Sequence, residues 1–169
     1  MAEPVRAGTA IGQLIEEQLA EERERKASLE ARGLSVITTS GVLVTLLLGF
    51  GALVSGDDDV VLPGVAEAVL IAGLVGFVGA AVAGLYTNSP VEYDEAEPED
   101  LRAWLEPQLW ESESVAGELR AAEARVEVLA AARRVNDRKA LVLAGAIAAE
   151  VVAIVLLAAA VAAIVLDAA

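Results

Sequence analysis

Glu150 is the only acidic residue that lies well inside one of the three long apolar runs of this chain. Counting about ten residues from the start of its run at 1.5 Å per residue places its carboxyl group roughly 15 Å deep in a bilayer. Thr45 and Gly76, in the two other runs, fall at a similar depth. Because no Lys or Arg lies in any of the runs, we expect this carboxyl group to be protonated or to face water.

A carboxyl group at this depth could serve as a proton or cation site, or it could line a pore in an oligomer. Alternatively, it could be a neutral acid that forms a hydrogen bond with Thr45 or with a backbone carbonyl across a helix interface. The sequence leaves both interpretations open. Glu150 and Thr45 are therefore the candidate intramembrane functional residues.

Other polar residues favour simpler interpretations. The acidic run 57–59 could bind a divalent cation, but three consecutive acids cannot all converge on one ion without further ligands, which favours a solvated turn. Glu67 lies near the start of its apolar run, at the outer end of the second span, and can reach water. Trp104 and Trp110 could form an interaction site, although packing of a short helix explains them as well. With no P-loop, GxGxxG or HExxH motif, we expect no catalytic residues, no bound cofactor and no metal site, and we do not expect an enzyme.

The composition points to a membrane protein. Of the 169 residues, 56% are hydrophobic, only 4% are aromatic and none is Cys or His. A mean hydropathy of +0.58 is too high for a soluble domain of this length. The absence of Cys and His argues against zinc and haem sites, and the net charge of −14 argues against nucleic acid as a partner.

The predicted fold is an all-α integral membrane protein. It has three transmembrane helices and a cytoplasmic stalk of two parallel helices that continue into the first and third spans. The predicted segments, in chain order, are a tail with a cytoplasmic helix (1–32), the first span (33–55), an extracytoplasmic turn (56–64), the second span (65–86), an acidic linker with a short helix (87–112), the stalk helix (113–139) and the third span (140–166).

Small residues recur every four positions in the first two spans. This pattern allows the backbones of two helices to approach closely, so we expect helix packing there and a homo-oligomer in the lipid bilayer. The candidate packing residues are Gly41 and Gly49, on either side of Thr45, in the first span and Gly76, Ala80 and Gly84 in the second.

Apolar residues in the stalk helix follow alternating spacings of four and three. The spacing predicts a heptad seam that becomes polar near the membrane. Either this seam forms a coiled coil, or the helix packs on neighbours in the same subunit. The seam consists of Val115, Leu119, Ala122, Val126, Leu129, Arg133 and Asn136.

The distribution of basic residues predicts the orientation. All twelve Lys and Arg residues lie in the segments 1–32 and 87–139. The positive-inside rule therefore places these segments and the N-terminus in the cytoplasm and the C-terminus outside, in an inner (cytoplasmic) membrane.

A short motif marks the start of the third span, where the residues Asp137-Arg138-Lys139-Ala140-Leu141-Val142-Leu143 form a D-x-K-A-x-x-L pattern. Lys26-Ala27-Ser28-Leu29 before the first span is a fainter version of it. This pattern after a cytoplasmic helix resembles the small transmembrane effectors of bacterial cyclic-nucleotide anti-phage systems (the Pycsar effector type). The resemblance implies an oligomer that perturbs the membrane when it is triggered from the cytoplasm.

Two functions fit these observations. The first is a non-enzymatic, oligomerising anchor or scaffold whose stalk binds a cytoplasmic protein partner. The second is a membrane-permeabilising or channel-like oligomer with Glu150 in the pore or gate. A secondary transporter is a weaker third hypothesis, because three spans without an inverted repeat are too few unless several chains combine.

Overall fold

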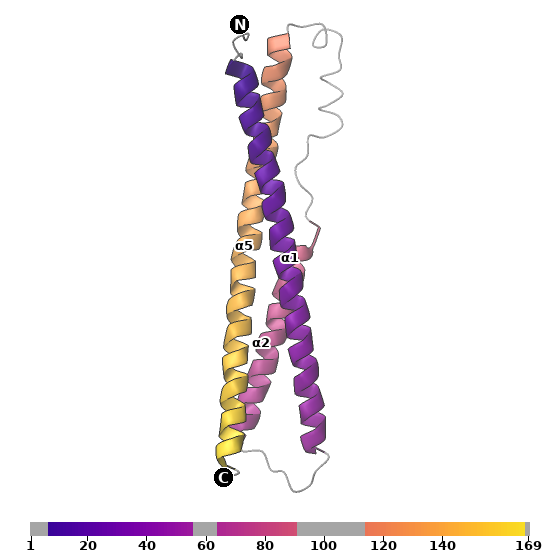
Figure 1. The fold of residues 1–169 in the computed structure, drawn as a ribbon, viewed down its shortest axis with the longest axis vertical. Coiled ribbons are helices and arrows are strands. Elements are labelled where there is room, and N and C mark those ends of the chain that lie inside the picture. Colours follow the sequence, from indigo (N-terminus) through magenta and orange to yellow (C-terminus); the bar gives the residue numbers. More distant parts are fainter. Residues whose placement is uncertain (1–6, 56–63, 91–113, 168–169) are drawn as a thin grey trace, which may run out of the picture. The chain divides into compact units, whose positions relative to one another are not determined.

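The computed structural model describes residues 7–55, 64–90 and 114–167. Within these ranges all regular structure is helical, in α1 (Ala7–Ser55), α2 (Gly64–Asn88) and α5 (Ser114–Asp167) (Figure 1). The predicted all-α class is therefore confirmed. The acidic turn 57–59, the short helix expected around Trp104 and the N-terminal tail before Ala7 lie outside the described residues.

All three helices are long and apolar enough to cross a membrane. The mean hydropathy of their most apolar stretches is 1.6 in α1, 2.4 in α2 and 2.8 in α5. The 49 residues of α1 and the 54 of α5 correspond to about 74 and 81 Å of helix, more than twice the roughly 30 Å of a hydrocarbon core. Three such helices indicate a multi-pass membrane protein.

The end of α2 shows how the sequence stops a helix. The helix ends at Asn88, two residues before Pro90, and a proline disfavours helical geometry at the residue before it, here Ser89. Side-chain hydroxyl groups add hydrogen bonds to carbonyl groups near this end, where the final four carbonyl groups of a helix have no partner within it. Thr87 Oγ1 donates to the Gly84 carbonyl at 2.7 Å, and Ser89 Oγ donates to the Tyr86 carbonyl at 2.7 Å.

The described residues form two compact units. The first, here called the polar unit, contains residues 7–28 of α1 and 114–138 of α5. In it the two helices run in parallel, because their partners advance together along both: Glu16 pairs with Arg125, and Glu22 with Asn136.

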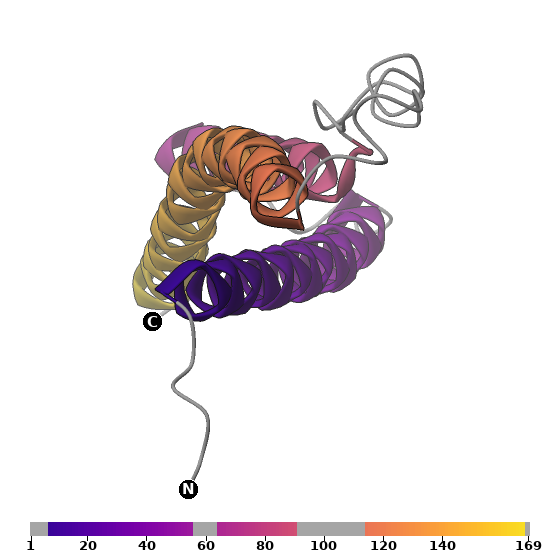
Figure 2. The same cartoon turned by 90° about the horizontal axis from the view of Figure 1, so that it is seen from above.

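The second unit, here called the apolar unit, contains residues 29–55, 64–89 and 139–167. Here α1 and α5 again run in parallel, and α2 lies against both in the opposite direction (Figures 1 and 2). Its core is built of small and branched apolar side chains. The buried members are Leu29, Val36, Ala80, Leu143 and Ala146, with Ala83, Ala140 and Ala149 packed beside them.

Glycines bring α1 and α2 together. A Cβ atom on Gly84 would lie only 2.9 Å from the carbonyl oxygen of Gly33, and a Cβ atom on Gly33 would overlap Thr87 Oγ1 and lie 3.1 Å from the carbonyl oxygen of Gly84. Neither position has room for a side chain. Since lipid offers no hydrophobic driving force between helices, such close contact is a main source of stability in a membrane bundle.

The buried positions of both long helices recur at alternating spacings of three and four residues. One stripe of each helix thus faces its neighbours, from Leu29 to Ser40 in α1 and from Leu129 to Ala160 in α5. In α1 the buried positions are Leu29, Gly33, Val36 and Ser40, and in α5 they include Leu129, Ala132, Asn136, Lys139, Leu143, Ala146, Ala153 and Ala160.

The stripe in α5 only partly coincides with the predicted stalk seam. The two share Leu129 and Asn136, which are buried, and Ala122, which is half-buried. Where the seam predicts Arg133, the buried residue of the stripe is its small neighbour Ala132. Arg133 is exposed beside the stripe, and its Nε atom is 3.5 Å from Glu22 Oε1. The remaining apolar members of the seam, Val115, Leu119 and Val126, are exposed in the single chain.

Candidate intramembrane site

Glu150 forms its polar contact with Ser40. The Ser40 hydroxyl donates a hydrogen bond to Glu150 Oε1 at 3.3 Å. Ser40 belongs to the buried stripe of α1, and Glu150 follows Ala146 by four residues and precedes Ala153 by three, so it continues the stripe of α5. The heptad spacing therefore points both side chains at the same interface.

Thr45 is not the partner of this carboxyl group. It is exposed, and its hydroxyl donates to the Gly41 carbonyl of the same helix at 2.9 Å. A threonine that bonds back to its own helix satisfies its hydroxyl without any tertiary contact. The alternative in which a neutral Glu150 forms a hydrogen bond across a helix interface thus has a partner in the structure, but that partner is Ser40.

Glu150 is half-buried, and its one hydrogen bond among the described residues comes from Ser40. A carboxyl group has four lone-pair positions, so one hydroxyl leaves most of its hydrogen-bonding capacity unused. In hydrocarbon this unused capacity is unfavourable, and it leaves the group able to accept a hydrogen bond from a water molecule or from a donor of another chain.

A second polar cluster lies at the end of the apolar unit that contains the start of the third predicted span. Lys139 Nζ is 3.3 Å from Glu30 Oε1 and donates to the Ser89 carbonyl at 3.2 Å. The lysine side chain is 1% exposed and that of Glu30 is 34% exposed. One side chain thus ties α5 to α1 and to the end of α2.

Sequence reasoning treated Lys139 only as a positive charge near the membrane and as part of a motif. The signal for burial was present, because Lys139 lies three residues after Asn136 and four before Leu143. This spacing places it in the buried stripe. A lysine at such a position needs an acidic partner, and Glu30 provides it.

The two predicted small-residue stripes occupy different environments. In α2, a Cβ atom on Gly76 would lie 3.0 Å from Ala153 Cβ, Ala80 is buried in the core, and Gly84 meets Gly33. This stripe packs within the chain. In α1, a Cβ atom on Gly41 or Gly49 would have no neighbour within 4 Å.

The polar unit holds a network around Glu22. Asn136 Nδ2 donates to Glu22 Oε2 at 2.8 Å and to the Glu22 carbonyl at 3.0 Å, and Arg133 lies beside the same carboxylate. Arg25 extends the network to Asp137, with Nη2 2.8 Å from Oδ1. These contacts fix the register of α1 against α5, because each joins a residue of α1 to a residue of α5 that lies beside it along the helix axes.

Metal-ligand chemistry has no basis in the residues that the structure describes, since no group of three or more acids lies close enough together to hold an ion. Glu67 is exposed in the first turn of α2, where an acidic side chain complements the helix dipole. Between its helices, the described part of the apolar unit thus has two polar contact sites, the Ser40–Glu150 pair and the Lys139 cluster.

Comparison of the chain with known proteins gave no match to any protein-family model, curated protein or solved structure.

Proposed function

We propose that this chain is a non-enzymatic integral membrane protein, an oligomerising anchor that presents a cytoplasmic two-helix stalk to a protein partner. The observation that carries the proposal is the division of α1 and α5. Each is a single helix with a charged N-terminal half and an apolar C-terminal half. Where the helices are charged, they pair in parallel through Glu16–Arg125 and the Glu22 network.

The charges support a cytoplasmic stalk. All twelve basic residues lie in the segments 1–32 and 87–139, and none lies in the turn before α2 or in the C-terminal tail. Basic loops of this kind stay on the cytoplasmic side of the inner membrane. The stalk would then stand in the cytoplasm, where its exposed side chains can meet a partner.

The chain has no cysteine, so single cysteines test this orientation directly. With a membrane-impermeant maleimide, Ala168→Cys should be labelled in intact spheroplasts, whereas Ala116→Cys should be labelled only after permeabilisation. The converse pattern would refute a cytoplasmic stalk. Labelling of both in intact spheroplasts would mean that α5 does not span the membrane.

The second candidate function is a channel-like or membrane-permeabilising oligomer, in agreement with the resemblance of residues 137–143 to anti-phage effectors. The observation that favours it is the partly satisfied carboxyl group of Glu150, which is half-buried and has a single hydroxyl partner. In an oligomer, such groups could gather around a shared polar path.

Ion or dye flux across proteoliposomes distinguishes the two functions, with Glu150→Leu as the variant. Flux in the wild type that is lost in Glu150→Leu supports the channel-like oligomer. A scaffold should give no flux in either protein and should remain stable with leucine at position 150, because burial of an apolar side chain in hydrocarbon is favourable. The matched control is Val151→Leu, an exposed neighbour on the same helix.

A further inference from the structure

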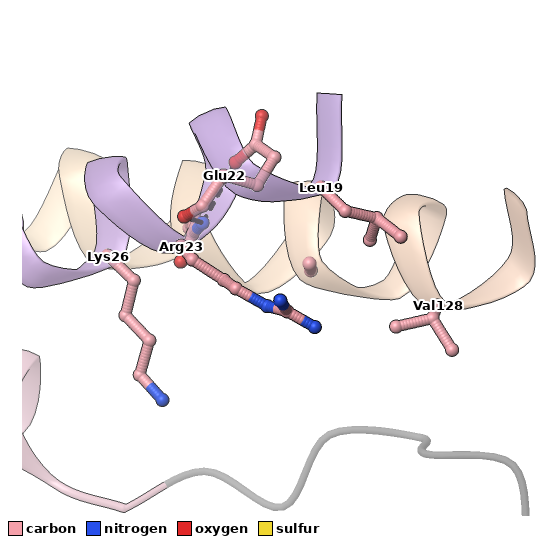
Figure 3. Close-up of a pocket in the computed structure, with 7 residues that line it drawn as sticks. Leu19, Glu22, Arg23, Lys26 and Val128 are labelled. Carbon is pink, nitrogen blue, oxygen red and sulfur yellow. Dashed lines mark hydrogen bonds between the residues drawn. The ribbon is translucent and has the colours of Figure 1, made fainter. Parts of the chain in front are cut away.

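A groove lies between α1 and α5 in the polar unit. It encloses about 190 Å³. Figure 3 shows Arg23 and Lys26 extending from α1 on the same side, with Leu19 and Val128 beside them. Its lining residues are Leu19, Glu22, Arg23 and Lys26 from α1 and Val128, Ala132 and Asn136 from α5.

Asn136 gives this groove an unmet hydrogen-bonding requirement. The residue is 1% exposed. While Nδ2 donates twice to Glu22, the acceptor Oδ1 is buried and has no partner among the described residues. Buried polar atoms are nearly always satisfied in native proteins, so an unpartnered acceptor in the lining of a groove points to a donor that arrives from outside the two helices.

The groove also favours an anion. Its one acid, Glu22, is already bound by Asn136 and flanked by Arg133 and Arg25. Arg23 forms no ion pair with any other residue that the structure describes. A fitting occupant therefore combines carboxylates, a hydrogen-bond donor and apolar side chains for Leu19 and Val128.

The segment 91–113 of the same chain has this chemistry. Its first ten residues hold six acids and no base, and Leu101 and Trp104 follow. The tryptophan carries an N–H group that can only donate. The acids are Glu92, Asp94, Glu95, Glu97, Glu99 and Asp100.

Both ends of this segment are joined to residues that the structure describes. Pro90 precedes it and follows Ser89, whose carbonyl accepts from Lys139, and Ser114, the first residue of α5, follows it. Lys139 and Ser114 are 25 residues apart along that helix (139 minus 114), which is about 38 Å. The 23 intervening residues can cover this span, and a tethered ligand acts at a high effective concentration.

We propose that the acidic segment 92–104 of the same chain binds in this groove. Its carboxylates bind Arg23 and Lys26, its apolar side chains cover Leu19 and Val128, and one of its donors reaches Asn136 Oδ1. The two helices of the polar unit thereby gain a third element from their own chain.

The first test uses fluorescence. The only two tryptophans of the chain, Trp104 and Trp110, both belong to the segment 91–113. In the full-length protein in nanodiscs, Arg23→Glu/Lys26→Glu should shift tryptophan emission to the red and increase its quenching by acrylamide. The matched control, Arg120→Glu/Arg134→Glu, makes the same charge change on exposed residues outside the groove and should leave both quantities unchanged. Equal spectra for wild type and groove variant, with unchanged circular dichroism, would overturn the proposal.

The second test uses crosslinking in the cysteine-free background. Arg23→Cys with Asp100→Cys should form an intramolecular disulfide, whereas Arg120→Cys with Asp100→Cys should not. An intermolecular product from the first pair would assign the groove to the segment of a second copy and overturn the proposal as stated. Failure of both pairs to form a disulfide would also overturn it.

Discussion

Lys139 Nζ and Glu30 Oε1 lie 3.3 Å apart between α5 and α1, and the two partners are buried to very different extents. Since the lysine is almost fully buried and the glutamate is about one-third exposed, removal of one partner is not equivalent to removal of the other. The charge that stays behind is costly only where water cannot reach it.

The first prediction follows from this asymmetry. Glu30→Leu leaves Lys139 as an uncompensated buried cation and should reduce the free energy of unfolding by about 3–5 kcal/mol. Lys139→Met leaves a partly hydrated carboxylate and should cost less. Unfolding in detergent micelles, followed by circular dichroism, measures both. Glu24→Leu, at an exposed residue of the same helix, is the control, and equal losses for the two cluster variants would contradict the asymmetry.

The second prediction concerns the contact between Gly33 and Gly84. Gly84→Ala places a methyl group 2.9 Å from a carbonyl oxygen, so α1 and α2 must separate, with an expected loss of about 1–3 kcal/mol in the free energy of unfolding. Gly41→Ala meets nothing within 4 Å and should stabilise the isolated chain by up to about 1 kcal/mol through helix propensity. Thermal unfolding of the two variants in the same detergent decides the point, and it would falsify the close-contact argument if Gly84→Ala were neutral.

The third prediction concerns the exposed seam of the stalk helix. Leu119 is 59% exposed in the single chain, so Leu119→Glu should leave helix content and monomer stability unchanged. If the proposed oligomer uses this seam, as its heptad spacing suggests, the variant should reduce the oligomer mass measured by light scattering. Ala130→Glu, at an exposed position of the same helix off this seam, should not. Unchanged mass for both variants would exclude the seam as an oligomer contact.

The helical class and the three apolar helices could be predicted because composition and length decide them. A run of about 20 apolar residues without proline has few alternatives to a helix that spans a membrane. The charged halves of α1 and α5 are rich in helix-forming residues, so each helix continues without a break from its charged half into its apolar half.

The contacts between helices were harder to predict, because they depend both on how deep a residue lies along its helix and on the side of the helix from which its side chain projects. Counting residues placed Thr45 at the level of Glu150, whereas the structure pairs Glu150 with Ser40, which lies about 7.5 Å earlier along α1. A helix also turns by about 100° per residue, so the level alone does not determine the direction of a side chain. Ser40 faces Glu150 because it continues the three–four spacing of Leu29, Gly33 and Val36. The same spacing would have indicated the burial of Lys139.

The last prediction concerns the pair Ser40–Glu150. In a scaffold, Ser40→Ala removes the one hydrogen-bond donor of Glu150 among the described residues, and a double-mutant cycle with Glu150→Leu should give a coupling of about 0.6 kcal/mol, the usual size for a hydrogen bond between membrane helices. Ser40→Ala should then have little effect on unfolding in the Glu150→Leu background. In a channel-like oligomer, Ser40→Ala should alter flux across proteoliposomes as well, because the hydroxyl orients the carboxyl group. Coupling in stability without any change in flux would make this pair a structural contact, whereas a change in flux without coupling would give Ser40 a role that its contact with Glu150 does not explain.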